Sequence, residues 1–163
     1  MKKTCLLLAA IAALIPSDIH AQSLHDKSAQ RQADSAAVRS VSGGATLDFA
    51  SPYEAVFDAL VNTLKRNGFT LDQADKDAGQ LATAMEISGG FHQTGKRTIF
   101  SLIKGTDGKT SVRVAVTIQK RSNGLQADPW SDPKVDEKAS ADYAAKIKLE
   151  LDVALAAKPA TEK

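Results

Sequence analysis

A strict alternation of apolar and polar residues near the middle of the chain constrains the fold most. In "TSVRVAVTIQ", residues 110–119, the inward positions hold Val112, Val114, Val116 and Ile118, and the outward positions hold Arg113, Ala115, Thr117 and Gln119. A period of two predicts a strand with one buried face. The run "KRTIFSLIK" precedes it across a glycine-bearing turn, "GTDGK". The two runs predict an antiparallel hairpin as the framework of the sheet.

Two helices are predicted on either side of this hairpin. In "SPYE", Ser51 is expected to cap the first helix, with Pro52 at its first position and Glu54 closing a capping box, and Asn67-Gly68 is expected to end it. Its apolar stripe comprises Tyr53, Val56, Phe57, Leu60, Val61 and Leu64. A longer helix is predicted over residues 134–157, with a core stripe of Tyr143, Ala144, Ile147, Leu151, Ala154 and Leu155.

Three shorter strands complete the pattern. They are predicted over residues 45–49, 69–75 and 81–87, the last with Leu81, Met85 and Ile87 on one face. The order β-α-β-β-β-β-α predicts an α+β fold, in which an antiparallel sheet of about five strands carries two helices on one face.

The first 21 residues have the features of a secretory signal peptide. Lys2 and Lys3 precede an apolar run from Cys5 to Ile15, and cleavage is expected after Ala21. The run is too short to cross a bilayer, which takes roughly 20 apolar residues. Cys5 starts the run instead of ending it, so lipid anchoring is not expected, nor is a transmembrane span in the mature chain. We therefore expect an exported protein.

The mature chain is expected to have three parts. Residues 22–44 are rich in Ser, Ala and Gln and predict a flexible arm, because they offer little apolar surface to bury. Residues 45–157 have the length of a single domain, and residues 158–163 are expected to form a disordered tail. Cys5 is the single cysteine of the chain, so its removal leaves no disulfide and no thiolate metal site.

The stretch "SGGFHQTGKRT", residues 88–98, has glycines and a lysine at the spacing of a phosphate-binding loop. Such a loop needs Ser or Thr directly after its lysine and a helix after that. Here Arg97 follows Lys96, and a β-branched, aromatic run comes next. We interpret the stretch as a hairpin loop, with Phe91 and His92 near its tip.

No constellation of residues indicates catalysis. His92 is the single histidine of the expected domain, so neither a catalytic triad nor a zinc site can be assembled. The carboxylates fall mostly in turns or on helix surfaces, where solvated charge is the ordinary state. We expect no enzymatic activity, no cofactor and no bound metal.

Basic residues predominate along the central hairpin. The set is Lys96, Arg97, Lys104, Lys109, Arg113, Lys120 and Arg121, with Asp107 as the only acid between them. Two interpretations remain open: a surface for anionic lipid headgroups or an acidic protein, or charges that keep a sheet edge soluble. Nucleic acid is not indicated, because the chain as a whole has 21 basic and 19 acidic residues.

Several large side chains have two interpretations each. Phe91 either folds back onto the sheet or contacts a partner, and Trp130 either pins a loop over the core or anchors a partner. Leu149 and Val153 lie off the main stripe of the last helix, where they either pack on the first helix or form an exposed contact. The candidate interaction residues are Phe91, His92, Arg97, Lys104, Arg113, Trp130, Leu149 and Val153.

One long segment resembles a known family. "SPYEAVFDALVNTLKRNGFTLDQADKDAGQLATAMEI" has the helix, glycine step and charged turn of the helix-grip domains of BamC, a lipoprotein of the outer-membrane β-barrel assembly machinery, and of several uncharacterised envelope families. The resemblance covers residues 45–118. It implies an accessory role through protein contacts in a bacterial envelope, and it favours the periplasm over secretion.

Two functions follow as expectations. The first is a non-catalytic binding or assembly-accessory module that contacts an envelope protein or an anionic lipid surface. The alternative is a carrier or sensor of a lipid or small amphiphile held between the sheet and the C-terminal helix.

Overall fold

The computed structural model describes residues 42–124 and 128–157. The expected signal peptide, nearly all of the expected arm and the expected tail lie outside the described residues. Within these ranges no helix has the length and apolar character needed to cross a membrane.

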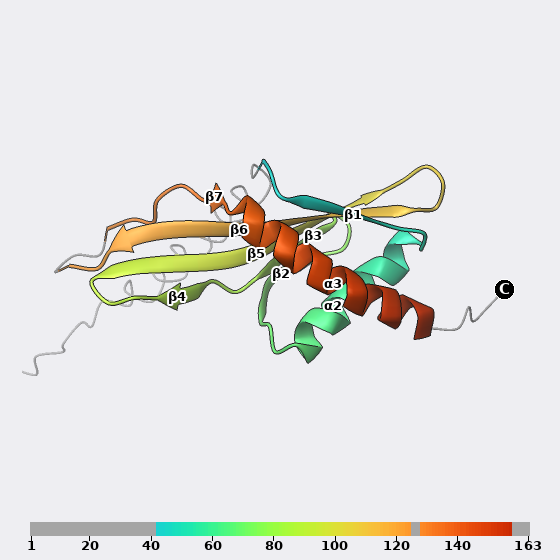
Figure 1. Ribbon diagram of the computed structural model, residues 1–163, viewed down its shortest axis with the longest axis horizontal. Coiled ribbons are helices and arrows are strands. Elements are labelled where there is room, and N and C mark those ends of the chain that lie inside the picture. The colour runs from blue at the N-terminus through green and yellow to red at the C-terminus, as the bar shows by residue number, and fades with distance from the viewer. Residues whose placement is uncertain (1–41, 125–127, 158–163) are drawn as a thin grey trace, which may run out of the picture. The chain divides into compact units, whose positions relative to one another are not determined.

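The described part is an α+β fold in which two helices pack on one face of an antiparallel sheet, as the sequence predicts (Figure 1). The elements are β1 (Ala45–Phe49), α2 (Tyr53–Arg66), β2 (Leu71–Asp75), β3 (Gln80–Thr83), β4 (Glu86–Ser88), β5 (His92–Lys104), β6 (Thr110–Ser122), β7 (Lys134–Val135) and α3 (Glu137–Ala157). The strand order is β1-β6-β5-β3-β2, with β4 paired to β5 and β7 paired to β6.

The predicted hairpin is the centre of this sheet. Strands β5 and β6 have 13 residues each and pair from His92 opposite Ser122 to Lys104 opposite Thr110. The first of these strands begins at His92, earlier than the sequence suggests, because β6 pairs with it from there and β4 pairs with its other edge from Thr94 to Lys96. His92 therefore lies in a strand and not in the loop.

The main core lies between the sheet and the helices. Leu81, Phe100 and Val114 stand opposite one another on three adjacent strands, and all three are fully buried. They pack with side chains from both helices: Val56, Phe57, Leu60, Leu64, Ala144, Ile147 and Leu151. The apolar stripes read from the sequence therefore do face the sheet.

The opposite face of the sheet also buries residues, contrary to the simple alternation. Ala115 is 3% exposed and Thr117 is 2% exposed, although both were predicted to face solvent. Ala115 lies opposite Ile99, which is itself buried, and Thr117 donates a hydrogen bond to the carbonyl oxygen of Arg97 at 3.3 Å. A period of two identifies the face of a residue but not whether that face is covered.

The strand predicted over residues 81–87 is wrong, because it is two strands. The pairing of β3 places Ala82 opposite Ile99, whereas the pairing of β4 places Glu86 opposite Lys96, a register shifted by one residue. One extra residue moves the later side chains to the other face. Ile87 consequently does not share the buried face of Leu81 and is 54% exposed.

The predicted capping box is also absent. Residue Pro52 occupies the N-cap position of α2, and no side chain caps this end. The carbonyl of Ser51 instead accepts a hydrogen bond from Thr110 Oγ1 at 2.9 Å, and Glu54 lies 3.7 Å from Lys104. Both residues expected to form the capping box therefore make tertiary contacts with the hairpin instead. The predicted end of the helix is confirmed, with Gly68 at a φ of 81°.

The C-terminal helix begins three residues later than predicted. Lys134 and Val135 pair with Ile118 and Thr117 as strand β7. Asp136 then caps α3, since its Oδ1 accepts a hydrogen bond from the amide of Ala139 at 2.9 Å.

Candidate ligand-binding site

A junction at the edge of β6 fixes where α3 lies. Strands β1 and β7 pair with different parts of this edge, and Val116 falls between them. The amide of Val116 donates to Ser140 Oγ at 2.9 Å, and its carbonyl accepts from the amide of Asp136 at 2.8 Å. Glu137 accepts a further hydrogen bond from the amide of Gly44 at 2.9 Å. The first turn of α3 therefore completes the sheet edge and sets the space beneath the helix.

That space is a cavity of about 420 Å³ between α3 and the sheet. Strands β3, β5 and β6 contribute Thr83, Thr98 and Val116. Phe69 comes from the segment that precedes β2. The helix contributes residues three or four positions apart, which share one face of a helix: Ala139, Asp142, Tyr143 and Lys146.

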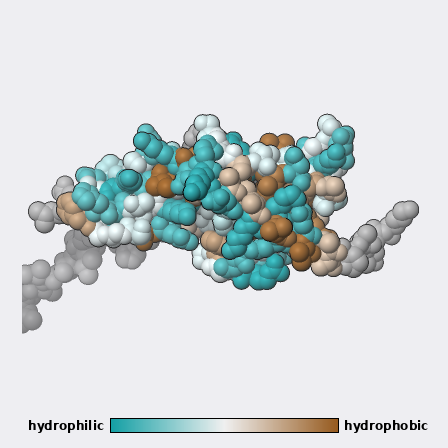
Figure 2. Space-filling view, in the orientation of Figure 1, coloured by the Kyte–Doolittle hydropathy of each residue, from teal (hydrophilic) through white to brown (hydrophobic). Residues whose placement is uncertain are grey.

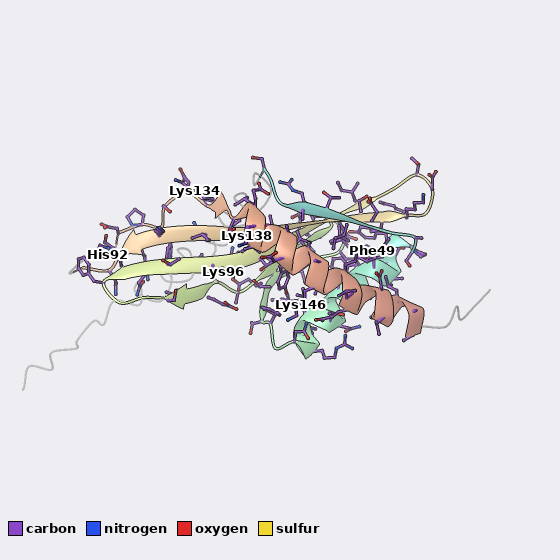
Figure 3. The ribbon with its side chains drawn as sticks, in the orientation of Figure 1. Phe49, His92, Lys96, Lys134, Lys138 and Lys146 are labelled. Carbon is purple, nitrogen blue, oxygen red and sulfur yellow. The ribbon has the colours of Figure 1, made fainter. Side chains whose placement is uncertain are left out.

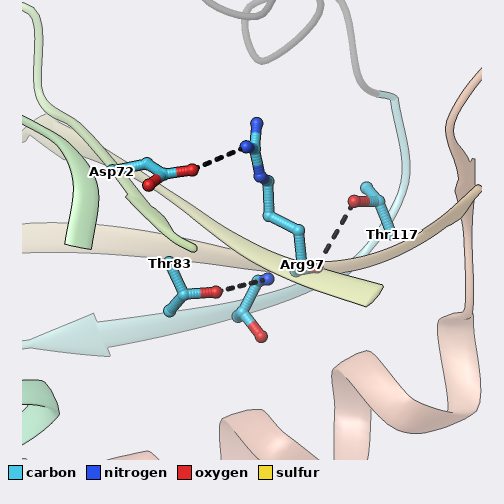
Figure 4. Close-up of polar contacts among 5 residues, drawn as sticks. Asp72, Thr83, Arg97 and Thr117 are labelled. Atoms are coloured by element: carbon cyan, nitrogen blue, oxygen red, sulfur yellow. Dashed lines mark hydrogen bonds and ion pairs between the residues drawn. The ribbon is translucent and has the colours of Figure 1, made fainter. Parts of the chain in front are cut away.

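The side-chain hydroxyl of Thr83, a residue of the cavity wall, already has a hydrogen-bond partner within the protein. Its Oγ1 accepts a hydrogen bond from the amide of Thr98 at 3.0 Å (Figure 4). This contact supplies an acceptor where the backbone pairing of β3 with β5 stops at Ala82.

Tyr143 is part of the cavity wall, but its hydroxyl is sealed off from the cavity. Its ring packs edge-on against Phe69, with the centroids 6.0 Å apart, and lies 6.1 Å from the ring of Phe100. The hydroxyl is buried and has no hydrogen-bond partner among the described residues. Burial raises the pKa of Tyr143 to about 12, with smaller contributions from Glu150 and Glu86. The group is therefore a neutral phenol that can donate a hydrogen bond.

Charged side chains of both signs surround the cavity. Lys96 and Lys146 are exposed cations, and Glu86 and Asp142 are exposed carboxylates. Figure 3 labels Lys96 on β5 and Lys146 on α3. Within the described part of the chain, none of the four forms an ion pair or hydrogen bond, so all four charges are available to a solute at the mouth.

Arg97, a predicted interaction residue, turns its side chain elsewhere. Its guanidinium lies 2.8 Å from Asp72 and points away from the α3 ribbon, as Figure 4 shows. The side chain is 12% exposed. Arg97 therefore forms an ion pair within the protein and does not offer an open surface to a partner.

The seven basic residues of the central hairpin lie at different places along it. Because β5 and β6 are 13 residues long, Lys104 and Arg121 lie near opposite ends of the hairpin. Lys104 is exposed and 3.7 Å from Glu54, and Arg113 is half-buried with its Nε donating to the carbonyl of Gly43 at 2.6 Å. The basic residues are therefore spread along the hairpin to both of its ends.

Phe91 does not fold back onto the sheet. It is 62% exposed, in the turn between β4 and β5, and its ring meets that of the exposed His92 edge-on at 5.0 Å. Strands β4 and β5 pair as far as Ser88 opposite Thr94 on the two sides of this turn. The same pairing places Gly95 and Lys96 inside β5, which confirms that the loop is not a phosphate-binding loop.

Trp130 packs on the hairpin and belongs to neither of the buried hydrophobic clusters among the described residues. It is half-buried, the guanidinium of Arg121 lies 4.4 Å from its ring centre, and its ring lies close to Gly95. The neighbouring Ser131 donates from its amide to the carbonyl of Lys120 at 2.9 Å. These contacts pin the loop against the hairpin.

Leu149 and Val153 do not pack on α2. Each is 70% exposed, and Figure 2 shows hydrophobic surface along the C-terminal half of α3. Packing on α2 is therefore wrong, and a contact formed by these exposed residues stays a prediction.

Metal-binding residues do not gather in the described ranges: no group of three or more His, Cys, Asp or Glu side chains is placed to hold an ion there. The cavity beneath α3 is thus the candidate site. It lies where the sequence analysis places the ligand of a carrier, between the sheet and the C-terminal helix. The sequence does not identify the residues of its wall, because Phe69, Thr83 and Lys96 meet α3 only through the tertiary fold.

Comparison with known proteins yields a structural neighbour. No protein-family model matches the chain, and no curated protein matches it. Among solved structures, the chain is similar to a DUF4468 family protein from Bacteroides ovatus ATCC 8483, with a TM-score of 0.37 and 15% sequence identity. The match covers 78% of this chain and 94% of that chain. The comparisons give no support to the expected resemblance to BamC, and a similarity at this level assigns neither function nor ligand.

Proposed function

We propose that the protein is a non-catalytic binding protein that holds a small amphiphile in the cavity between α3 and the sheet. The observation that carries the proposal is the cavity itself, about 420 Å³ between α3 and the sheet, with the apolar residues Phe69 and Val116 in its wall.

The size and lining of the cavity fit this role. Its volume of about 420 Å³ lies in the range of small-molecule sites, roughly 300–1,000 Å³. Phe69, Val116 and Ala139 supply apolar surface for the hydrophobic part of a ligand. The charged residues at the mouth suit a polar end that stays in contact with water.

A bulky substitution in the helix wall tests the proposal. Ala139 lines the cavity and is half-buried, whereas Ala141 lies two positions along the same helix and is exposed. Ala139→Trp should fill the cavity and abolish uptake of medium-chain alcohols in native mass spectrometry, while Ala141→Trp should leave uptake unchanged. Circular dichroism checks that both variants fold, and Ala139→Leu serves as a milder block. Uptake that is equal in all four proteins would exclude this cavity as the site.

A second candidate function rests on a different observation. Leu149 and Val153 are each 70% exposed on α3, which suits an accessory protein that docks on an envelope partner through this helix. Crosslinking of the tagged protein in its native envelope should capture a partner, and the double substitution Leu149→Ser/Val153→Ser should abolish the capture. Equal capture by both proteins would remove this helix from the interface.

We also propose that the protein is exported. The support is the sequence of the first 21 residues, with two lysines before an apolar run. Sequencing the N-terminus of the protein recovered from cells should find Gln22 as the first residue. Recovery of the chain with residues 1–21 still attached would contradict export by cleavage.

A further inference from the structure

We infer that the hydroxyl of Thr98 binds an uncharged polar group at the buried end of the ligand, such as an alcohol hydroxyl. This inference rests on the proposed function, and it names the residue and the ligand group that meet at the sheet side of the cavity. It follows from the face that Thr98 occupies, the accessibility of its hydroxyl and the place of the charged residues around it.

The side chain of Thr98 faces α3. Thr98 lies two residues before Phe100 on β5, and Phe100 belongs to the core between the sheet and the helices. Side chains two positions apart on a strand share one face of the sheet. Thr98 also lies opposite Val116 on β6, and both residues line the cavity. Thr98 is therefore part of the sheet side of the cavity.

The hydroxyl of Thr98 is open to this cavity. Among the described residues, the side-chain oxygens that are sealed from solvent and have no hydrogen-bond partner are those of Thr63 and Tyr143. The hydroxyl of Thr98 also forms no hydrogen bond within the described part of the chain, but its oxygen is not sealed off as those two are. Because Thr98 faces α3 and is only 6% exposed, the accessible surface of this oxygen opens into the cavity.

The backbone of Thr98 is held in place next to β3. Its amide donates a hydrogen bond to Thr83 Oγ1 at 3.0 Å, at the point where β3 ends. A β-branched side chain such as threonine has few χ1 rotamers, so a fixed backbone also limits where its hydroxyl can lie. A small number of polar groups at defined positions is what orients a ligand in an otherwise apolar pocket.

The surroundings of this hydroxyl favour an uncharged ligand group. A threonine hydroxyl can donate or accept a hydrogen bond, which suits an alcohol. A charged group buried at the same place would need an opposite charge beside it. The guanidinium of Arg97 is paired with Asp72 and points away from α3 (Figure 4). The other charged side chains of the lining are exposed: Glu86, Lys96, Asp142 and Lys146.

Two symmetric probes of the same length test the inference. Octane-1,8-diol has a hydroxyl at each end, so one hydroxyl reaches Thr98 whichever end enters first, and 1,8-difluorooctane has none. Amide chemical shifts followed by NMR during titration of the full chain give both dissociation constants. Thr98→Val should weaken binding of the diol by about 3- to 10-fold, the value of one neutral hydrogen bond, and should not weaken binding of the difluoride. Thr98→Ser keeps the hydroxyl and should retain the affinity for the diol.

The matched control is Thr94→Val. Thr94 lies on the same strand and is half-buried, but it does not line the cavity, so this variant should bind both probes as the unaltered protein does. Circular dichroism checks that each variant folds. Equal weakening of both probes by Thr98→Val, or an unchanged affinity for the diol, would overturn the inference while the proposed function stands. Failure of both probes to bind the unaltered protein would instead remove the proposed function.

Discussion

Replacing Ser140 by alanine should destabilise the protein by removing the hydrogen bond that joins α3 to the sheet edge. Ser140 is fully buried, and its Oγ accepts from the amide of Val116 at 2.9 Å and donates to the carbonyl of Asp136 at 2.6 Å. The Asp136 carbonyl keeps a second donor in the variant, the amide of Ser140 itself, at 2.9 Å. The group left without a partner is therefore the Val116 amide.

The expected magnitude follows from two opposing effects. A buried backbone amide that loses its acceptor costs about 1–3 kcal/mol. Alanine has a better helix propensity than serine by roughly 0.5 kcal/mol, which offsets part of this loss. The net decrease in the free energy of unfolding is therefore about 0.5–2.5 kcal/mol.

Urea denaturation followed by circular dichroism measures this change, with hydrogen exchange at the Val116 amide as a local readout. Ser111→Ala is the matched control, because Ser111 lies on the same strand and bonds Asp48 at 2.6 Å where solvent can replace the contact. The control should change stability by less than about 0.5 kcal/mol. Equal midpoints for the two variants, with unchanged exchange at Val116, would refute the assigned role of Ser140.

Two further predictions concern single residues. The tyrosinate absorbance of the folded protein should show Tyr143 ionising near its raised pKa of about 12, after Tyr53, and Tyr143→Phe should remove that last step. Since the folded pKa exceeds the value of 10.0 for a free tyrosine, the stability that Tyr143 contributes is complete below pH 10 and is lost as the pH rises to about 12; a thermal midpoint that falls equally in Tyr143→Phe over this range would contradict it. Gly95→Ala should lower the urea midpoint, because a Cβ atom there would overlap the sulfur of Met85, whereas Gly90→Ala meets nothing within 4 Å and should leave the midpoint unchanged. Equal midpoints for the two glycine variants would show that Met85 moves aside freely.

The local signals in the sequence predicted much of this fold. The period of two in residues 110–119 and the helical stripes predicted β6, α2 and α3, and Gly68 ended α2 where its backbone needs a positive φ. These features depend on neighbours within a few residues of one another, so a single sequence contains them. The class of the fold followed from their order.

The tertiary structure alone decided the features that depend on distant partners. A shift of one residue in the pairing with β5 turned Ile87 outward, and the long hairpin dispersed the basic residues that lie close together in the sequence. In the sequence, nothing distinguishes Ser140 from other polar residues of the helix; in the structure, its hydroxyl accepts a hydrogen bond from the amide of Val116 at the sheet edge. Tyr143 follows the core stripe of its helix in the sequence, and only the packing of α3 over the sheet makes it part of a cavity wall with its hydroxyl buried. Periodicity reports which face a side chain occupies, whereas the partners on that face are set by strand register and helix docking.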